Sequence, residues 1–223
     1  MKKTNLKNSD GFSLIELIVS MLIMLILLGI VGSLLSRSLS VRARESQRTD
    51  ALTSAQAALN VISREIANSG FGIATGPTSR IASNGIAAAD SNADRLHIRS
   101  NINNVGPRTA PPGSTVLSTN QPGEDITYFL DTATDSIVRY NPNGTPQTSV
   151  VVNRISDVTF QYFDYVGANS TGVEVAIPTP DTGRVRITVA VRLDPITGQP
   201  NPLTVTFTSD VTLRNSKYML NQY

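Results

Sequence analysis

The sequence predicts an α+β protein in which one long N-terminal helix packs on an antiparallel β-sheet. Three observations carry this prediction: an uncharged apolar run over Leu17–Ser36, a three- and four-residue apolar period that continues to Ile66, and period-two alternation after residue 123. No proline precedes Pro77 to interrupt the helix. The apolar stripe of a helix and the apolar face of a sheet must both be buried, and packing the helix on the sheet buries them together.

The apolar segment at residues 12–36 is long enough to cross a membrane. Leu17–Ser36 contains 20 residues without a charge, which gives about 30 Å of helix, the thickness of the hydrocarbon core. Glu16 stands at the start of this run. A charge in such a place costs roughly 2.5–3.5 kcal/mol on insertion scales. We therefore expect Glu16 to be functional and to need a cation at the same depth; a plain anchor or an uncleaved signal peptide leaves it unexplained.

The helix is predicted to continue through residues 37–69, where helix-forming side chains dominate. One apolar stripe covers this half: Leu52, Ala55, Leu59, Ile62 and Ile66. Gly70 and Gly72 then provide a stop of the C-cap type. We predict a single helix from Phe12 to Ser69 whose stripe packs on the rest of the chain. A coiled-coil partner helix is the alternative.

The remaining chain divides into an irregular connection at residues 70–122 and a sheet domain at residues 123–223. The connection contains one expected strand around Leu96–Ile98. Alternating patterns predict strands in the domain at 126–131, 136–140, 149–152, 158–162, 184–193 and 203–213. Asn143-Gly144 indicates a short turn, and residues 195–200 connect the last two strands. Alternation of this kind predicts one dry and one wet sheet face.

The composition and the motifs of the chain argue against several classes of function. The formal charge of +2 and the lack of a basic patch with aromatic residues give no support for nucleic-acid binding. The chain has no cysteine, which excludes a disulfide framework and a thiolate zinc site. His97 is the single histidine, and neither a Gly-x-Ser-x-Gly nor a phosphate-binding loop pattern occurs. We expect a structural His97, no enzymatic activity and no cofactor.

Two polar groups have an alternative interpretation. Oxygen-bearing side chains gather at Asp90, Asn92 and Asp94, and amides at Asn101, Asn103 and Asn104. A solvated loop is the first interpretation and a calcium site the alternative, because calcium prefers oxygen ligands. Three arginines lie on the predicted wet sheet face: Arg184, Arg186 and Arg192. They form either a solvated face or a docking surface for an acidic partner subunit.

The N-terminus resembles a known signal. A leader with Lys2, Lys3 and Lys7 precedes Gly11-Phe12-Ser13-Leu14-Ile15-Glu16 and the apolar run. This arrangement is similar to the class III signal of type IV prepilins and type II secretion pseudopilins. The resemblance implies a pilin-like fold, cleavage after Gly11 by a prepilin peptidase, and residues 1–11 as the leader peptide. It also implies N-methylation of Phe12 and pairing of Glu16 with the Phe12 amine of a neighbouring subunit.

Two further segments resemble a subgroup. Ala55–Ile66 followed by Gly70-Phe71-Gly72, and the tail Val211–Asn215, are similar to PilW-like minor pilins and PulJ-like (J-type) pseudopilins. The absence of cysteine departs from many major pilins, and so does Ser33, which stands where many of them have proline.

The resemblance implies a minor structural subunit held in the bacterial inner membrane, with its C-terminal domain outside, and then a place in a pilus or pseudopilus at the tip. Expected partners are sibling minor pilins or pseudopilins, the prepilin peptidase and the inner-membrane assembly platform. The alternative is a bitopic, membrane-anchored binding module that does not polymerise.

Overall fold

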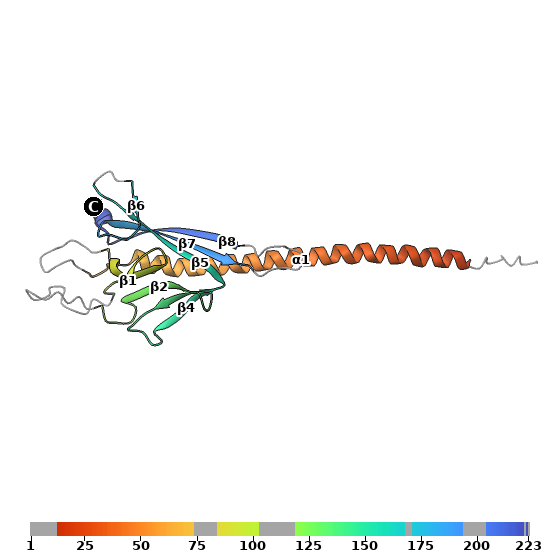
Figure 1. The fold of residues 1–223 in the computed structure, drawn as a ribbon, viewed down its shortest axis with the longest axis horizontal. Coiled ribbons are helices and arrows are strands. Elements are labelled where there is room, and N and C mark those ends of the chain that lie inside the picture. Colours follow the sequence, from red (N-terminus) through yellow and green to blue (C-terminus); the bar gives the residue numbers. More distant parts are fainter. Residues whose placement is uncertain are drawn as a thin grey trace, which may run out of the picture. The chain divides into compact units, whose positions relative to one another are not determined.

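The computed structural model describes residues 13–73, 84–102, 119–167, 171–193, 204–220 and 222. The chain divides into two compact units, Met1–Ser46 and Gln47–Tyr223. Helix α1 (Leu14–Ala67) is 54 residues long and contributes residues to both units (Figure 1). The predicted helix, Phe12–Ser69, was two residues longer at each end. Phe12 lies outside the described residues, and Ser69 belongs to a turn in which its N–H bonds the Ile66 carbonyl at 3.0 Å.

In the first unit, α1 is apolar on all sides over Leu17–Ser36, and the large side chains of this run are exposed. The Ser13 carbonyl begins the helix by accepting the N–H groups of Glu16 and Leu17 at 3.0 and 3.2 Å. Hydroxyl groups within the apolar run bond backwards along the helix: Ser33 donates to the Ile30 carbonyl at 2.8 Å. The hydroxyls of Ser20 and Ser33 are thereby satisfied within the helix, as a segment in lipid requires.

In the second unit, α1 buries one face. Its buried residues are Ala55, Ala58, Leu59, Ile62 and Ile66, so four of the five predicted stripe residues are confirmed. Leu52 is the exception, with 38% of its surface exposed, while its neighbour Ala51 packs against the core. At 100° per residue Ala51 lies within 40° of Ala55 and Leu52 lies 60° away on the other side, which puts Leu52 at the stripe's edge.

Eight strands form two four-stranded sheets. The first sheet has the order β1 (Arg95–Arg99), β2 (Asp125–Asp131), β3 (Ser136–Tyr140), β4 (Thr148–Asn153). The second has the order β6 (Val173–Val175), β5 (Ile155–Asp164), β7 (Thr182–Arg192), β8 (Thr204–Thr212). Every pairing is antiparallel. The α+β class is confirmed, but the strands expected in one sheet are shared between two.

The chain passes from one sheet to the other at a single residue. Arg154 separates β4 from β5 and has a φ of 64°, a left-handed conformation that is uncommon for a residue with a side chain. The Arg154 carbonyl accepts the Arg192 N–H of β7 at 3.0 Å, and the Ile155 N–H bonds the Asp135 carbonyl at 2.8 Å. These bonds tie the crossing point to both sheets.

The predicted hairpins and alternation are present. Strands β3 and β4 pair across the Asn143-Gly144 turn, with Tyr140 opposite Thr148. In β7 the dry-face residues Val185, Ile187, Val189 and Val191 are all buried. Strand β8 pairs with β7 along its whole length; the connection at residues 195–200 lies outside the described residues.

One core joins α1 to both sheets. Ile62 and Ile66 of α1 share it with Tyr128 and Ile137 of the first sheet and with residues of the second sheet such as Phe160. A short 3-10 helix, η1 (Ala88–Asp90), precedes β1, and a one-turn helix, α2 (Lys217–Leu220), follows β8.

Candidate functional site

Glu16 lies in the first turn of α1. An acidic side chain is favoured there because the free N–H groups make a helix N-terminus partly positive, an effect of about 0.3–1 kcal/mol. The side chain is exposed, and no described residue forms an ion pair with it. The predicted cleavage residues Gly11 and Phe12 lie outside the described residues, so the cleavage, the methylation and the ion pair stay predictions.

The helix that follows Glu16 has an unusual surface. Its large apolar side chains from Leu14 to Leu35 are each more than half exposed. Nothing lies within 4 Å of the position that a Cβ would take on Gly29 or Gly32, so the glycines leave open space on the helix surface. Among the described residues, α1 is the one helix long and apolar enough to span a membrane, with a mean hydropathy of 2.9 over its most apolar window.

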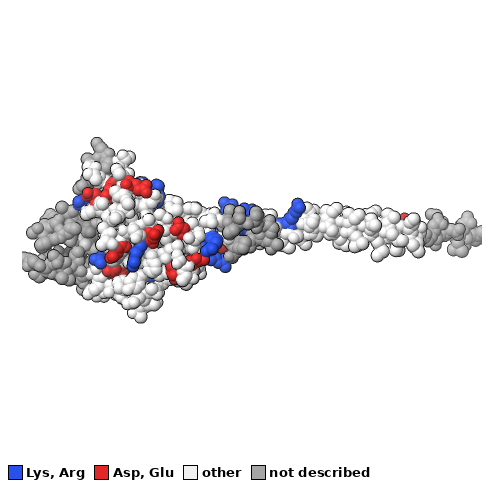
Figure 2. All heavy atoms as spheres, in the orientation of Figure 1, with Lys and Arg blue, Asp and Glu red and all other residues white. Residues whose placement is uncertain are grey.

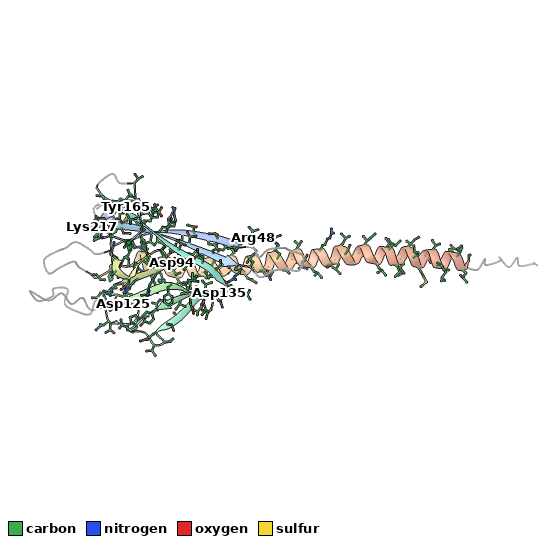
Figure 3. The ribbon with its side chains drawn as sticks, viewed as in Figure 1. Arg48, Asp94, Asp125, Asp135, Tyr165 and Lys217 are labelled. Carbon is green, nitrogen blue, oxygen red and sulfur yellow. The ribbon has the colours of Figure 1, made fainter. Side chains whose placement is uncertain are left out.

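His97 is held between two carboxylates in the β1–β2 region. Its Nδ1 lies 3.1 Å from Asp90 Oδ2, and its Nε2 lies 2.7 Å from Asp125 Oδ1. The side chain is 9% exposed, and Figure 3 labels Asp125 on the first sheet. With both ring nitrogens engaged, His97 cross-links η1, β1 and β2, as expected of a structural histidine.

Of the predicted calcium ligands, Asp90 and Asn92 bond within the fold, while Asn101 Oδ1 is buried with no hydrogen-bond partner among the described residues. Asn103 and Asn104 lie outside the described residues. Asp90 contacts His97, and Asn92 Oδ1 accepts the Asp94 N–H at 2.9 Å. Among the described residues, no group of three or more His, Asp or Glu side chains is arranged to hold a metal ion. The Asn92–Asp94 bond gives this loop the geometry of a turn.

The three arginines of the second sheet do not form a free basic stripe. Arg186 donates from Nε and Nη2 to both carboxylate oxygens of Asp210 at 2.8 and 3.0 Å. This contact lowers the pKa of Asp210 and raises that of Arg186. Arg192 contacts Asp135 at 2.6 Å, and Arg184 stacks 4.1 Å over the ring of Phe163. Figure 2 shows blue and red side chains interspersed over this unit. These contacts favour the solvated-face interpretation.

A second charged cluster was not predicted. Glu65 on α1 accepts a hydrogen bond from the buried Tyr128 hydroxyl of β2 and one from Arg139 Nε of β3 at 3.0 Å. Burial, together with the negative Glu65, raises the pKa of Tyr128. The cluster attaches α1 to the first sheet. The available sequence signal was a single carboxylate beside the stripe residue Ile66, but the sequence does not identify its partners.

An aromatic pair lines a hollow at the end of the second sheet. The rings of Tyr165 and Tyr218 stack with centroids 4.1 Å apart, and Lys217 bonds Asp181 at 2.9 Å beside them. The hollow has a volume of about 290 Å³. Figure 3 shows Tyr165 and Lys217 together at this end of the unit. The lining provides no nucleophile with an adjacent base, so it does not resemble a hydrolytic site.

Residues 6–32 match the family model for the prokaryotic N-terminal methylation motif. The match covers the last six residues of the predicted leader, the predicted cleavage residues, Glu16 and most of the apolar run. It supports a type IV pilin-like precursor, and with the apolar helix it fits a precursor held in the inner membrane. Neither a curated protein nor a solved structure matches the chain.

Proposed function

We propose that the chain is a minor pilin-like structural subunit of a type IV pilus or a type II secretion pseudopilus. The observation that carries this proposal is Glu16, one carboxylate in the first turn of a helix whose next 20 residues are uncharged and whose apolar side chains are exposed. Such a surface needs lipid or like helices around it. A carboxylate in that setting needs a cation at the same level along the helix.

Maturation would supply that cation. Cleavage after Gly11 leaves a free amine on Phe12, four residues before Glu16, which is about one helical turn. N-methylation of Phe12 retains the positive charge of this amine. Pairing the Phe12 amine of one subunit with Glu16 of the next offsets the cost of burying either charge alone. The pair would also fix the axial position of one helix against its neighbour.

The finer assignment follows the resemblance. A PilW-like minor pilin or J-type pseudopilin would join sibling subunits through α1 near the tip of the filament, after processing by the prepilin peptidase at the inner-membrane assembly platform. The C-terminal domain would then lie outside the membrane. We propose a structural role without enzymatic activity or a cofactor, because the methylation motif is that of a structural family.

The first test is mass spectrometry of the N-terminal peptide from cells with and without the prepilin peptidase. We expect a chain that begins at N-methylated Phe12 only when the peptidase is present. A chain that retains Met1–Gly11 in both strains would contradict the proposal and favour the membrane-anchored binding module.

The second test replaces the carboxylate. We expect Glu16→Val to insert in the membrane normally but to be lost from sheared filaments or tip complexes, because the Phe12 amine then has no partner. Asp50→Val is the matched control, since it removes an exposed carboxylate of the same helix outside the apolar run, and it should assemble. Normal assembly of Glu16→Val would refute the ion-pair mechanism.

A further inference from the structure

We propose that four arginines that follow the apolar run of α1 bind the phosphate groups of anionic phospholipids. This basic segment comprises Arg37, Arg42, Arg44 and Arg48. It rests on the membrane insertion of α1 in the proposed function, but on neither cleavage nor assembly. Figure 2 shows that basic side chains follow the white, apolar stretch of the helix, and Figure 3 marks Arg48 on α1.

The spacing places these side chains at the membrane surface. Arg37 directly follows the last uncharged residue, Ser36, so it lies where a spanning helix leaves the hydrocarbon core. At 1.5 Å per residue, Arg42 and Arg44 lie about 8 and 11 Å further along and Arg48 about 17 Å. The Cα–Cβ bonds of a helix tilt toward its N-terminus, so arginine side chains here extend back toward the lipid headgroups.

The charges of this segment are available. All four arginines are exposed, and none forms an ion pair with a described residue. Several arginines of the sheets differ: Arg139 and Arg186 are paired with carboxylates, and Arg184 stacks on Phe163. Residues 37–48 contain a single acidic side chain, Glu45, which gives the segment a net charge of +3.

The chemistry favours a lipid phosphate over other anions. The guanidinium group presents paired donors that match phosphate oxygens. Basic residues next to a membrane span attract anionic lipids with a strength of about fivefold in association per residue near the surface. Arg37, Arg44 and Arg48 share one helix face at intervals of seven and four residues, and Arg42 lies on another. This distribution fits lipids that surround a helix better than a single docked acidic chain.

The test measures lipid preference around the full-length chain in vesicles of phosphatidylcholine with 20% phosphatidylglycerol. Spin-labelled versions of each lipid report the fraction held in the first shell of the protein. We expect phosphatidylglycerol to be enriched around the wild-type chain. Changing all four arginines to glutamine should lower this enrichment by about fivefold or more, and changing them to lysine should retain it. Arg37→Gln should have a larger effect than Arg48→Gln, since the attraction falls off within a Debye length of about 10 Å at 0.1 M salt.

Two controls separate the outcomes. Changing Lys2, Lys3 and Lys7 to glutamine reports the leader's own contribution, and Arg64→Gln removes an exposed arginine of α1 far from the run. Equal phosphatidylglycerol enrichment around the wild type and around the fourfold glutamine variant would overturn the lipid proposal. If the enrichment is equal and the variant loses cross-links to an acidic sibling subunit, the segment is a protein contact. Failure of the wild type to float with vesicles would overturn membrane insertion itself, and with it the proposed function.

Discussion

The Glu65 cluster offers the sharpest test of how α1 is attached to the sheets. In Glu65→Ala, the hydroxyl of Tyr128 loses its acceptor while it remains fully buried. Leaving a buried donor unsatisfied, with the loss of a bond to a charged group, costs about 1.5–3 kcal/mol. The Arg139 contact adds less, because the side chains of Arg139 and Glu65 are 20% and 23% exposed and solvent screens such pairs to about 0.5–1 kcal/mol. We therefore expect a loss of about 2–4 kcal/mol in the free energy of unfolding.

The measurement is chemical denaturation of the full chain in detergent micelles. The chain has no tryptophan and six tyrosines, so tyrosine fluorescence and far-ultraviolet circular dichroism report the transition. Glu65→Gln is the matched control, because its amide oxygen still accepts from Tyr128 while the charge is gone. It should lose less than Glu65→Ala.

A double-mutant cycle isolates the ion pair. Arg139→Met and Glu65→Ala should together cost less than the sum of the single changes, because the second change removes a partner that the first has already left unpaired. A Glu65→Ala loss below about 0.5 kcal/mol, within the range of an ordinary surface substitution, would refute the argument that this cluster holds α1 to the first sheet.

Two further predictions concern the domain. Burial raises the pKa values of Tyr128 and Tyr162, so the folded state retains these protons while unfolded tyrosines ionise near pH 10. The contribution of these tyrosines to the free energy of unfolding should be constant below that pH and fall above it by up to about 1.4 kcal/mol per pH unit for each tyrosine. Denaturation at pH 9–11.5 measures this slope, which should be smaller for Tyr128→Phe. Both Gly85 and Gly123 have positive φ, but a Cβ on Gly85 would lie 2.0 Å from the backbone nitrogen of Gly70, whereas nothing lies within 4 Å of one on Gly123. Gly123→Ala should lower the free energy of unfolding by about 1–2 kcal/mol from backbone strain alone, and Gly85→Ala should lower it clearly more. Equal losses in the two variants would contradict the packing argument.

The elements of this fold could be predicted because their signals are local. The dry-face residues of β7 alternate with polar ones, and the stripe that includes Ile62 recurs at helical spacing. Leu52 was misplaced because the three-residue step from Ala55 puts it at the stripe's edge, a distinction of some 60° around the helix that residue spacing alone does not resolve.

The division into two sheets could not be predicted in the same way. It depends on the left-handed conformation of Arg154, and arginine gives no sequence signal for such a backbone, unlike glycine. The partners of Glu65 are similarly hidden, because Arg139 is 74 residues away. Contacts of this kind follow from the packing of elements, which periodicity does not specify.

In the candidate site, by contrast, one residue gives a local sequence signal and its proposed partner lies outside the chain. Glu16 was identified from sequence because a charge beside an uncharged run is a local anomaly, and the structure places it in the first turn of α1. Its proposed partner belongs to another copy or a sibling subunit, so a single chain does not contain the complete site.

The energetics of α1 explain why one carboxylate can direct assembly. The large apolar side chains from Leu14 to Leu35 are each more than half exposed, and covering them is worth on the order of 20 kcal/mol, more than the whole stability of a typical domain. Lipid tails and neighbouring apolar helices cover this surface almost equally well, so the hydrophobic contribution nearly cancels when a helix moves from one to the other.

The free-energy difference between a helix in lipid and a helix among its neighbours then depends on smaller contributions. An unpaired Glu16 in lipid costs a few kcal/mol, and the proposed pairing with the Phe12 amine of a neighbour would remove that cost only in the assembled state. A loss of about 2.5–3.5 kcal/mol corresponds to about 100-fold in an assembly constant, which is why Glu16→Val should abolish incorporation without preventing membrane insertion.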